Sequence, residues 1–136
     1  MNSKLDIYIV SGARTAIGTF GGGLSSLHPA ELGAIVMKEA IARAGIQAVD
    51  VQNVVVGNVV LTQPKDVYVS RVAAVNAGVS VEAPAMNVNR LCGSGLQAVI
   101  SAAQGIALGE HDVALAGGAE SMSNAPLICM TARNGQ

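Results

Sequence analysis

The sequence predicts an α/β fold, in which helices cover both faces of an open and mainly parallel sheet. Short runs rich in β-branched residues alternate along the chain with longer segments of helical periodicity. Glycines follow the helical segments at the positions where helices commonly end. Strands separated by helices form βαβ units, and such units build parallel sheets in three layers.

The order of elements is expected to be βαβαβαβ. The strands are short and apolar, and each ends near a glycine or a polar residue. They are expected at Ile7–Val10, Val54–Val60, Ala85–Val88 and Val113–Ala116.

The first two helices are predicted from their end signals. One begins at Pro29 and ends at Gly45, because proline suits the first helical position and glycine suits the position after the last. Its preceding residue, His28, is interpreted as a helix-entry residue. The second covers Val67–Ala77, with Asp66 as its cap and a glycine after it.

The third helix is expected over Gly93–Leu108. No Asp, Glu, Lys or Arg occurs between Leu91 and Gly109, so this helix is small or apolar on every side and is predicted to be buried. Its serines, glutamines and glycines make it too polar to insert into a membrane.

Cys92 immediately precedes this helix, at the carboxyl end of the third predicted strand. The first N–H groups of a helix lack internal partners, and the positive end of the helix dipole lies there. A thiol at such a position loses its proton more readily than a free thiol, and the thiolate is the nucleophile. Cys92 is therefore a candidate for covalent catalysis, although a free cysteine is also commonly a small buried hydrophobe.

Other nucleophile and nucleotide motifs do not fit this region. A papain-like site would need a second cysteine and an aromatic residue at Gly95 and Leu96. An esterase elbow around Ser94 would need glycine at Cys92, and a dinucleotide site would need a third glycine after Gly93 and Gly95.

The segment Asn89-Arg90-Leu91-Cys92-Gly93-Ser94-Gly95-Leu96-Gln97-Ala98 resembles the nucleophile segment of the thiolases, the family of acetyl-CoA acetyltransferases and β-ketothiolases. Further stretches resemble the family in the same order, and the resemblance extends from about Asp6 to Ser123. These stretches are Val10–Gly22, Val56–Val59, Arg71–Ala74 and Ala116–Ser123.

This resemblance implies a thiolase-like three-layer fold, with the N-terminal α/β half at residues 1–120 and the start of a truncated loop region at 121–136. It implies an acyltransferase that makes or cleaves 3-ketoacyl-CoA, such as acetoacetyl-CoA. Cys92 would carry the acyl group as a thioester, and its backbone N–H would contribute to the oxyanion hole. Coenzyme A thioesters, acetyl-CoA among them, would be substrates with no bound cofactor, and the protein would be a homo-oligomer, a dimer or a tetramer.

The motifs that supply the family's histidines and second catalytic cysteine do not occur in this chain. Its histidines are His28 and His111, and its other cysteine, Cys129, is followed by Met130 where the family motif has glycine. The 136 residues alone are therefore expected to be inactive. Two alternatives stay open: a non-catalytic thiolase-like piece, and a relative of the ketoacyl synthases.

Composition argues against several other functions. The net charge is −1 with no run of like charges, which gives no electrostatic basis for binding nucleic acid or a membrane surface. Two cysteines far apart in sequence make neither a disulfide framework nor a metal site, and the N-terminus lacks a signal or transit pattern. A cytoplasmic location is expected. His111 is expected to be a solvated turn residue, and Cys129 to have a structural or incidental role.

Overall fold

A computed structural model describes residues 6–135. Its centre is a three-stranded parallel sheet formed by β1 (Asn53–Gly57), β2 (Ala85–Val88) and β3 (Ala114–Gly118) in the order β2-β1-β3. The helices are α1 (Pro29–Ala44), α2 (Val69–Ala77) and α3 (Ser94–Ala107). Short 3₁₀ turns cover Ala48–Asp50, Pro64–Tyr68, Met122–Asn124 and Ala132–Asn134.

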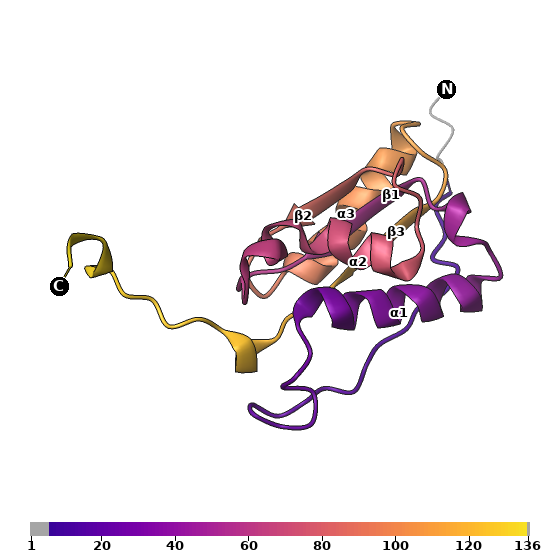
Figure 1. Cartoon of the computed structure of the whole chain (residues 1–136). Helices are drawn as coiled ribbons and strands as arrows, with labels where there is room; N and C mark the ends of the chain where they lie inside the picture. The colour runs from indigo at the N-terminus through magenta and orange to yellow at the C-terminus, as the bar shows by residue number, and fades with distance from the viewer. Residues whose placement is uncertain (1–5, 136) are drawn as a thin grey trace.

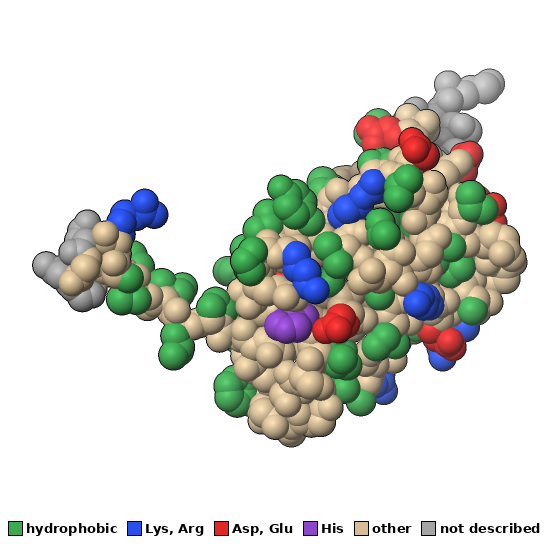
Figure 2. All heavy atoms as spheres, in the orientation of Figure 1, with side chains coloured by type: hydrophobic (Ala, Val, Ile, Leu, Met, Phe, Trp, Pro, Cys, Tyr) green, Lys and Arg blue, Asp and Glu red, His purple; other side chains and the backbone are tan. Residues whose placement is uncertain are grey.

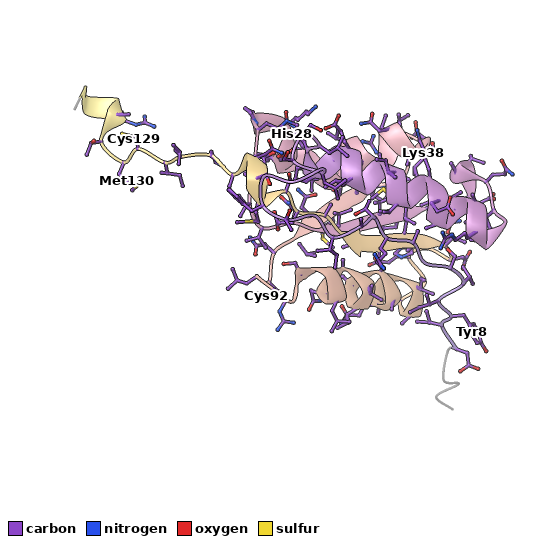
Figure 3. The ribbon with its side chains drawn as sticks, turned by 90° about the horizontal axis from the view of Figure 1, so that it is seen from below. Tyr8, His28, Lys38, Cys92, Cys129 and Met130 are labelled. Carbon is purple, nitrogen blue, oxygen red and sulfur yellow. The ribbon has the colours of Figure 1, made fainter. Side chains whose placement is uncertain are left out.

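The molecule has three layers, as the sequence predicts. Figure 3 shows α1, which carries Lys38, on one side of the sheet and α3, which follows Cys92, on the other. Two cores separate the layers. Val54 and Val56 of β1 pack with α1 and α2, whereas Val55 faces Ala98 and Ala102 of α3. The alternation of side chains along one strand thus divides β1 between the two cores.

The predicted end signals of α1 are confirmed. The helix starts at Pro29, the His28 N–H donates to the Glu31 carboxylate at 2.8 Å, and Gly45 adopts a left-handed φ of 69° at the C-cap. The α3 helix also matches the expected range, but only one of its faces is buried. Leu96 is 69% exposed, so the outer face of α3 is open in this chain, and burial of that face in a complete subunit stays a prediction.

The predicted strand at Ile7–Val10 is wrong. These residues have no regular structure and are exposed, and an apolar groove between α1 and α3 separates them from the edge of β3. A strand exists through hydrogen bonds to a neighbouring strand, and none is formed by this segment within residues 6–135. The apolar composition of Ile7–Val10 does not show whether a neighbouring strand is available to pair with it.

Two further boundaries differ from the predictions. β1 ends at Gly57 and does not reach Val60, because the Val59 and Val60 N–H groups donate to the Glu120 carboxylate and not to another strand. The second helix begins at Val69 and is preceded by the 3₁₀ turn, so Asp66 does not cap it. The Asp66 carboxylate instead accepts hydrogen bonds from Thr62 and Gln63, ahead of that turn.

The expectation that His111 is solvated is also wrong. The ring is 8% exposed and lies against Gly105 of α3, where a Cβ would collide with it. His111 Nε2 lies 3.2 Å from the Ala102 carbonyl oxygen, and Nδ1 lies 3.2 Å from Asn53 Nδ2. The histidine joins the start of β1 to α3 and is part of the packing.

Residues 121–124 remain attached to the body of the molecule. The Ser121 hydroxyl donates to the Leu27 carbonyl at 2.8 Å, and Asn124 Nδ2 donates to the Ser25 carbonyl at 2.8 Å. Beyond Asn124 the chain leaves the body as an extended tail (Figure 1). Among residues 6–135, no helix combines the length and the apolar character needed to cross a membrane.

Candidate active site

Cys92 lies where the carboxyl ends of all three strands meet. β2 ends at Val88, and the next four residues form a turn that brings Cys92 to the start of α3 (Figure 3). Ligands of open α/β sheets bind outside the carboxyl ends of the strands. The thiol is exposed and borders an open cleft of about 480 Å³. The expected position of Cys92 is confirmed by this placement.

The cleft has apolar walls with one carboxylate at the rim. Val59 and Val60 come from the segment after β1, Leu91 from the turn, and Met122 from the 3₁₀ turn after β3. Glu120 also borders the cleft. A thiol in such a cleft is accessible to a small acyl group.

Glu120 fixes the segment that follows β1. Its carboxylate accepts hydrogen bonds at 3.0 Å from each of the Val59 N–H, the Val60 N–H and Asn58 Nδ2. Two of the lining residues, Val59 and Val60, are thereby attached to the chain beyond β3. Our sequence interpretation missed this role, although the positions of Asn58 and Glu120 after two adjacent parallel strands are a signal that could have indicated it.

Close backbone contact joins β1 to α3 behind the thiol. A Cβ added at Gly57 would lie 2.5 Å from the Ser94 carbonyl carbon, closer than any side chain tolerates. Glycine at this position allows the first turn of α3 to lie directly on the end of β1. The N-terminus of α3, and Cys92 with it, is therefore held at the carboxyl end of the central strand, β1.

Neither histidine lies beside the thiol. His111 contacts Asn53 at the start of β1, at the opposite end of the sheet, and His28 Nδ1 lies 2.8 Å from the Thr62 hydroxyl. No group of three or more His, Cys, Asp or Glu side chains suited to a metal ion occurs among residues 6–135. Within residues 6–135, both histidines therefore have partners away from the Cys92 thiol.

Cys129 is the second exposed thiol, and it lies on the tail far from Cys92 (Figure 3). Hydrogen bonds from the Thr131 backbone N–H and hydroxyl lower the pKa of the Cys129 thiol below its ordinary value of 9.0. This makes Cys129 a competitor in any labelling experiment, which our sequence interpretation did not anticipate.

The model of the N-terminal domain of thiolases matches residues 7–136, nearly the whole chain. The chain belongs to the thiolase family. A β-ketothiolase of Cupriavidus necator, BktB, is 62% identical over 130 residues, and an acetyl-CoA acetyltransferase of the same organism is 45% identical over 130 residues. Both alignments cover 96% of this thiolase chain and 33% of the relative.

A solved structure of the acetyl-CoA acetyltransferase of Bacillus anthracis superposes on this thiolase chain with a TM-score of 0.89 at 38% sequence identity. The superposition covers 94% of this chain and 32% of that structure. The chain spans about a third of the length of these relatives. The predicted family and the predicted fold class are both confirmed.

Proposed function

We propose that this chain is the N-terminal part of an acyltransferase that makes or cleaves 3-ketoacyl-CoA, with Cys92 as the acyl-carrying nucleophile. The observation that carries the proposal is the position of Cys92: an exposed thiol before the first turn of α3, in a cleft at the carboxyl ends of the strands. Nucleophilic cysteines occur at helix N-termini, where the thiolate is stabilised.

The reaction at Cys92 would be a thioester exchange. The Cys92 thiol gives up its proton, and its sulfur attacks the thioester carbonyl of acyl-CoA to form a new C–S bond. The tetrahedral oxyanion collapses, the bond to the coenzyme A sulfur breaks, and the departing thiolate takes up the equivalent of that proton. The Cys92 backbone N–H would donate to the oxyanion as one of its two donors. The other donor, the histidine base and the second cysteine of the family are not present in these 136 residues and would have to come from outside them.

The same proposal extends to substrates, assembly and location. Acetyl-CoA and 3-ketoacyl-CoA would be the small-molecule partners, and no tightly bound cofactor would be required. The protein would form a homo-oligomer, either a dimer or a tetramer, and would be located in the cytoplasm. It would bind neither nucleic acid nor membranes. Residues 1–120 would form the N-terminal α/β half, and residues 121–136 would begin the loop region.

Alkylation with iodoacetamide followed by peptide mapping tests the assignment of Cys92. The folded protein is expected to label faster at Cys92 than at Cys129 near pH 7, and this preference is expected to disappear in denaturant. Faster labelling of Cys129 in the folded protein would contradict the assignment, since Cys129 is fully exposed and its own hydrogen bonds already favour its thiolate.

A second candidate function, a non-catalytic thiolase-like piece, rests on the distance of both histidines from Cys92. Thiolysis of acetoacetyl-CoA separates the two candidates. The 136 residues alone are expected to show no enzyme-like rate, because a missing general base costs about 10²–10⁴ in rate. A longer chain that continues past Gln136 is expected to be active and to lose that activity on Cys92→Ser. An inactive longer chain would favour the non-catalytic candidate.

A further inference from the structure

The backbone before Cys92 is held in an unfavourable conformation. Among residues 6–135, Leu91 is the only residue other than glycine with a positive φ, which is 51°. A Cβ disfavours this left-handed region, so a leucine remains there only where its surroundings hold it. Leu91 immediately precedes the thiol, and its conformation sets the direction from which Cys92 enters α3.

The hydroxyl of Ser94 is bonded on both sides of Leu91. Ser94 Oγ accepts a hydrogen bond from the Arg90 N–H at 2.8 Å and donates one to the Leu91 carbonyl oxygen at 2.6 Å. The Ser94 side chain is almost fully buried, so water cannot easily replace either bond. One hydroxyl therefore bonds to the Asn89–Arg90 peptide group, one residue before the Leu91 Cα, and to the Leu91–Cys92 peptide group directly after it.

The remaining contacts of the turn act in the same direction. Asn89 Oδ1 accepts a hydrogen bond from the Leu91 N–H at 3.1 Å, and the Ser94 N–H donates to the Leu91 carbonyl at 3.1 Å. Ser94 is itself fixed from behind, because its backbone lies directly against Gly57 at the end of β1. Ser94 thus links the two regions: its backbone contacts the end of β1, and its hydroxyl bonds to the turn around Leu91.

We infer that Ser94 is a positioning residue, whose hydroxyl keeps Leu91 in the left-handed conformation and so holds the Cys92 thiol at the N-terminus of α3. This inference rests on the proposed function, since it assigns Ser94 a role in presenting the proposed nucleophile. Without the hydroxyl, the Arg90 N–H and the Leu91 carbonyl lose a shared partner, and fewer contacts hold Leu91 at its positive φ. The thiol then leaves its place before the first turn of α3, where it borders the cleft.

The test measures the alkylation rate of Cys92 as a function of pH, in a Cys129→Ser background so that a single thiol reacts. Ser94→Ala is expected to lower the rate near pH 7 about tenfold, equivalent to about 1.4 kcal/mol. Ser101→Ala is the matched control. Ser101 lies on the same helix and accepts a hydrogen bond from Gln97 at 3.0 Å, and its loss is expected to leave the profile unchanged.

A double-variant cycle separates positioning from a general structural role. Glycine adopts a positive φ without a steric penalty, so Leu91→Gly is expected to reduce the effect of Ser94→Ala to less than about threefold. An equal effect of Ser94→Ala in both backgrounds would overturn the inference. If Ser94→Ala alone loses the helical circular dichroism signal, Leu91→Gly combined with Ser94→Ala is expected to recover both that signal and the labelling of Cys92. A double variant that recovers neither would also overturn the inference.

The outcomes for Ser94 and for the proposed function can be distinguished. If Cys92 in the Cys129→Ser parent reacts no faster than it does in denaturant, the assignment of Cys92 as an activated nucleophile fails. If the parent reacts faster but Ser94→Ala has the same pH profile, only the role of Ser94 fails.

Discussion

The Thr62 hydroxyl donates a 2.6 Å hydrogen bond to the carboxylate of Asp66, a side chain with no solvent exposure. The same hydroxyl lies 2.8 Å from Nδ1 of His28, the residue before α1. Asp66 also accepts hydrogen bonds from the Thr62 N–H at 2.8 Å and the Gln63 N–H at 3.1 Å. This buried carboxylate therefore connects the segment after β1 to the start of α1.

Asp66 is expected to make stability depend on pH in the acid range. Burial raises the pKa of its carboxyl group, but the hydrogen bonds from Thr62 and Gln63 outweigh burial and hold the pKa below the ordinary value of 3.8. A group with a lowered pKa in the folded state stabilises it above the unfolded pKa, and this contribution is lost as the pH falls through the folded value. Urea unfolding between neutral pH and pH 3 is expected to show that loss below about pH 4.

Asp66→Asn is expected to reduce the free energy of unfolding at pH 7 by about 2 kcal/mol and to flatten the acid dependence. The asparagine amide has about the same volume as the carboxylate, but its NH₂ group would face the N–H and O–H donors of Thr62 and Gln63. Asp112→Asn, at an exposed position, serves as the control and is expected to change neither quantity. Unchanged stability of Asp66→Asn at pH 7 would contradict this prediction.

Gly57→Ala is expected to destabilise the fold by about 1–3 kcal/mol and to slow alkylation of Cys92. The new methyl group would lie 2.5 Å from the Ser94 carbonyl carbon. Neither atom can rotate away, because the methyl carbon is fixed to the backbone of β1 and the carbonyl carbon is part of the backbone of α3. Gly117→Ala is a matched control, because Gly117 pairs in register with Val56 in the same sheet and has no atom within 4 Å of an added Cβ. Equal effects of the two substitutions would show that the contact between β1 and α3 is not tight.

Local signals in the sequence predicted those features of the fold that depend on local chemistry. His28, Pro29 and Gly45 define α1 through capping and backbone preferences that act within one turn. The position of Cys92 followed from the strand and helix on either side of it. The family resemblance added the expected role of the thiol.

The errors concern contacts between residues far apart in sequence. Whether Ile7–Val10 forms a strand depends on a neighbouring strand, and no property of those residues encodes it. The placement of the His111 ring depends on Asn53, which lies 58 residues earlier in the chain. Likewise, the hydrogen bonds that the Val59 and Val60 N–H groups donate to Glu120 join segments that come together only when β1 and β3 pair.

Ala102→Lys is expected to reduce the free energy of unfolding by several kcal/mol, because it would bury an ammonium group without a partner. Ala102 is 5% exposed and packs with Val55 and Ala98 between α3 and the sheet. Ala107→Lys is the matched control on the exposed side of the same helix and is expected to have little effect. Wild-type stability of Ala102→Lys would mean that the buried face of α3 is assigned incorrectly.

The 136 residues alone are expected to self-associate in solution. Charged residues make up only 12% of the sequence and the net charge is −1, so electrostatic repulsion between molecules is weak. Exposed apolar side chains occur along the N-terminal segment, on the outer face of α3 and on the tail. Figure 2 shows those of the tail, which extends from the body. Exposed apolar surface of this kind favours association.

Sedimentation velocity at several protein concentrations measures this association. The weight-average sedimentation coefficient is expected to rise with concentration, and Leu96→Glu with Ile100→Glu is expected to reduce the rise. Both side chains lie on the outer face of α3, 69% and 41% exposed, so the substitutions add repulsion without disturbing the core. Gln104→Glu adds one charge to the same helix while leaving both apolar side chains in place, and it controls for charge alone. A concentration-independent monomer that unfolds cooperatively would show that these residues cover their own apolar surface and form a self-sufficient domain.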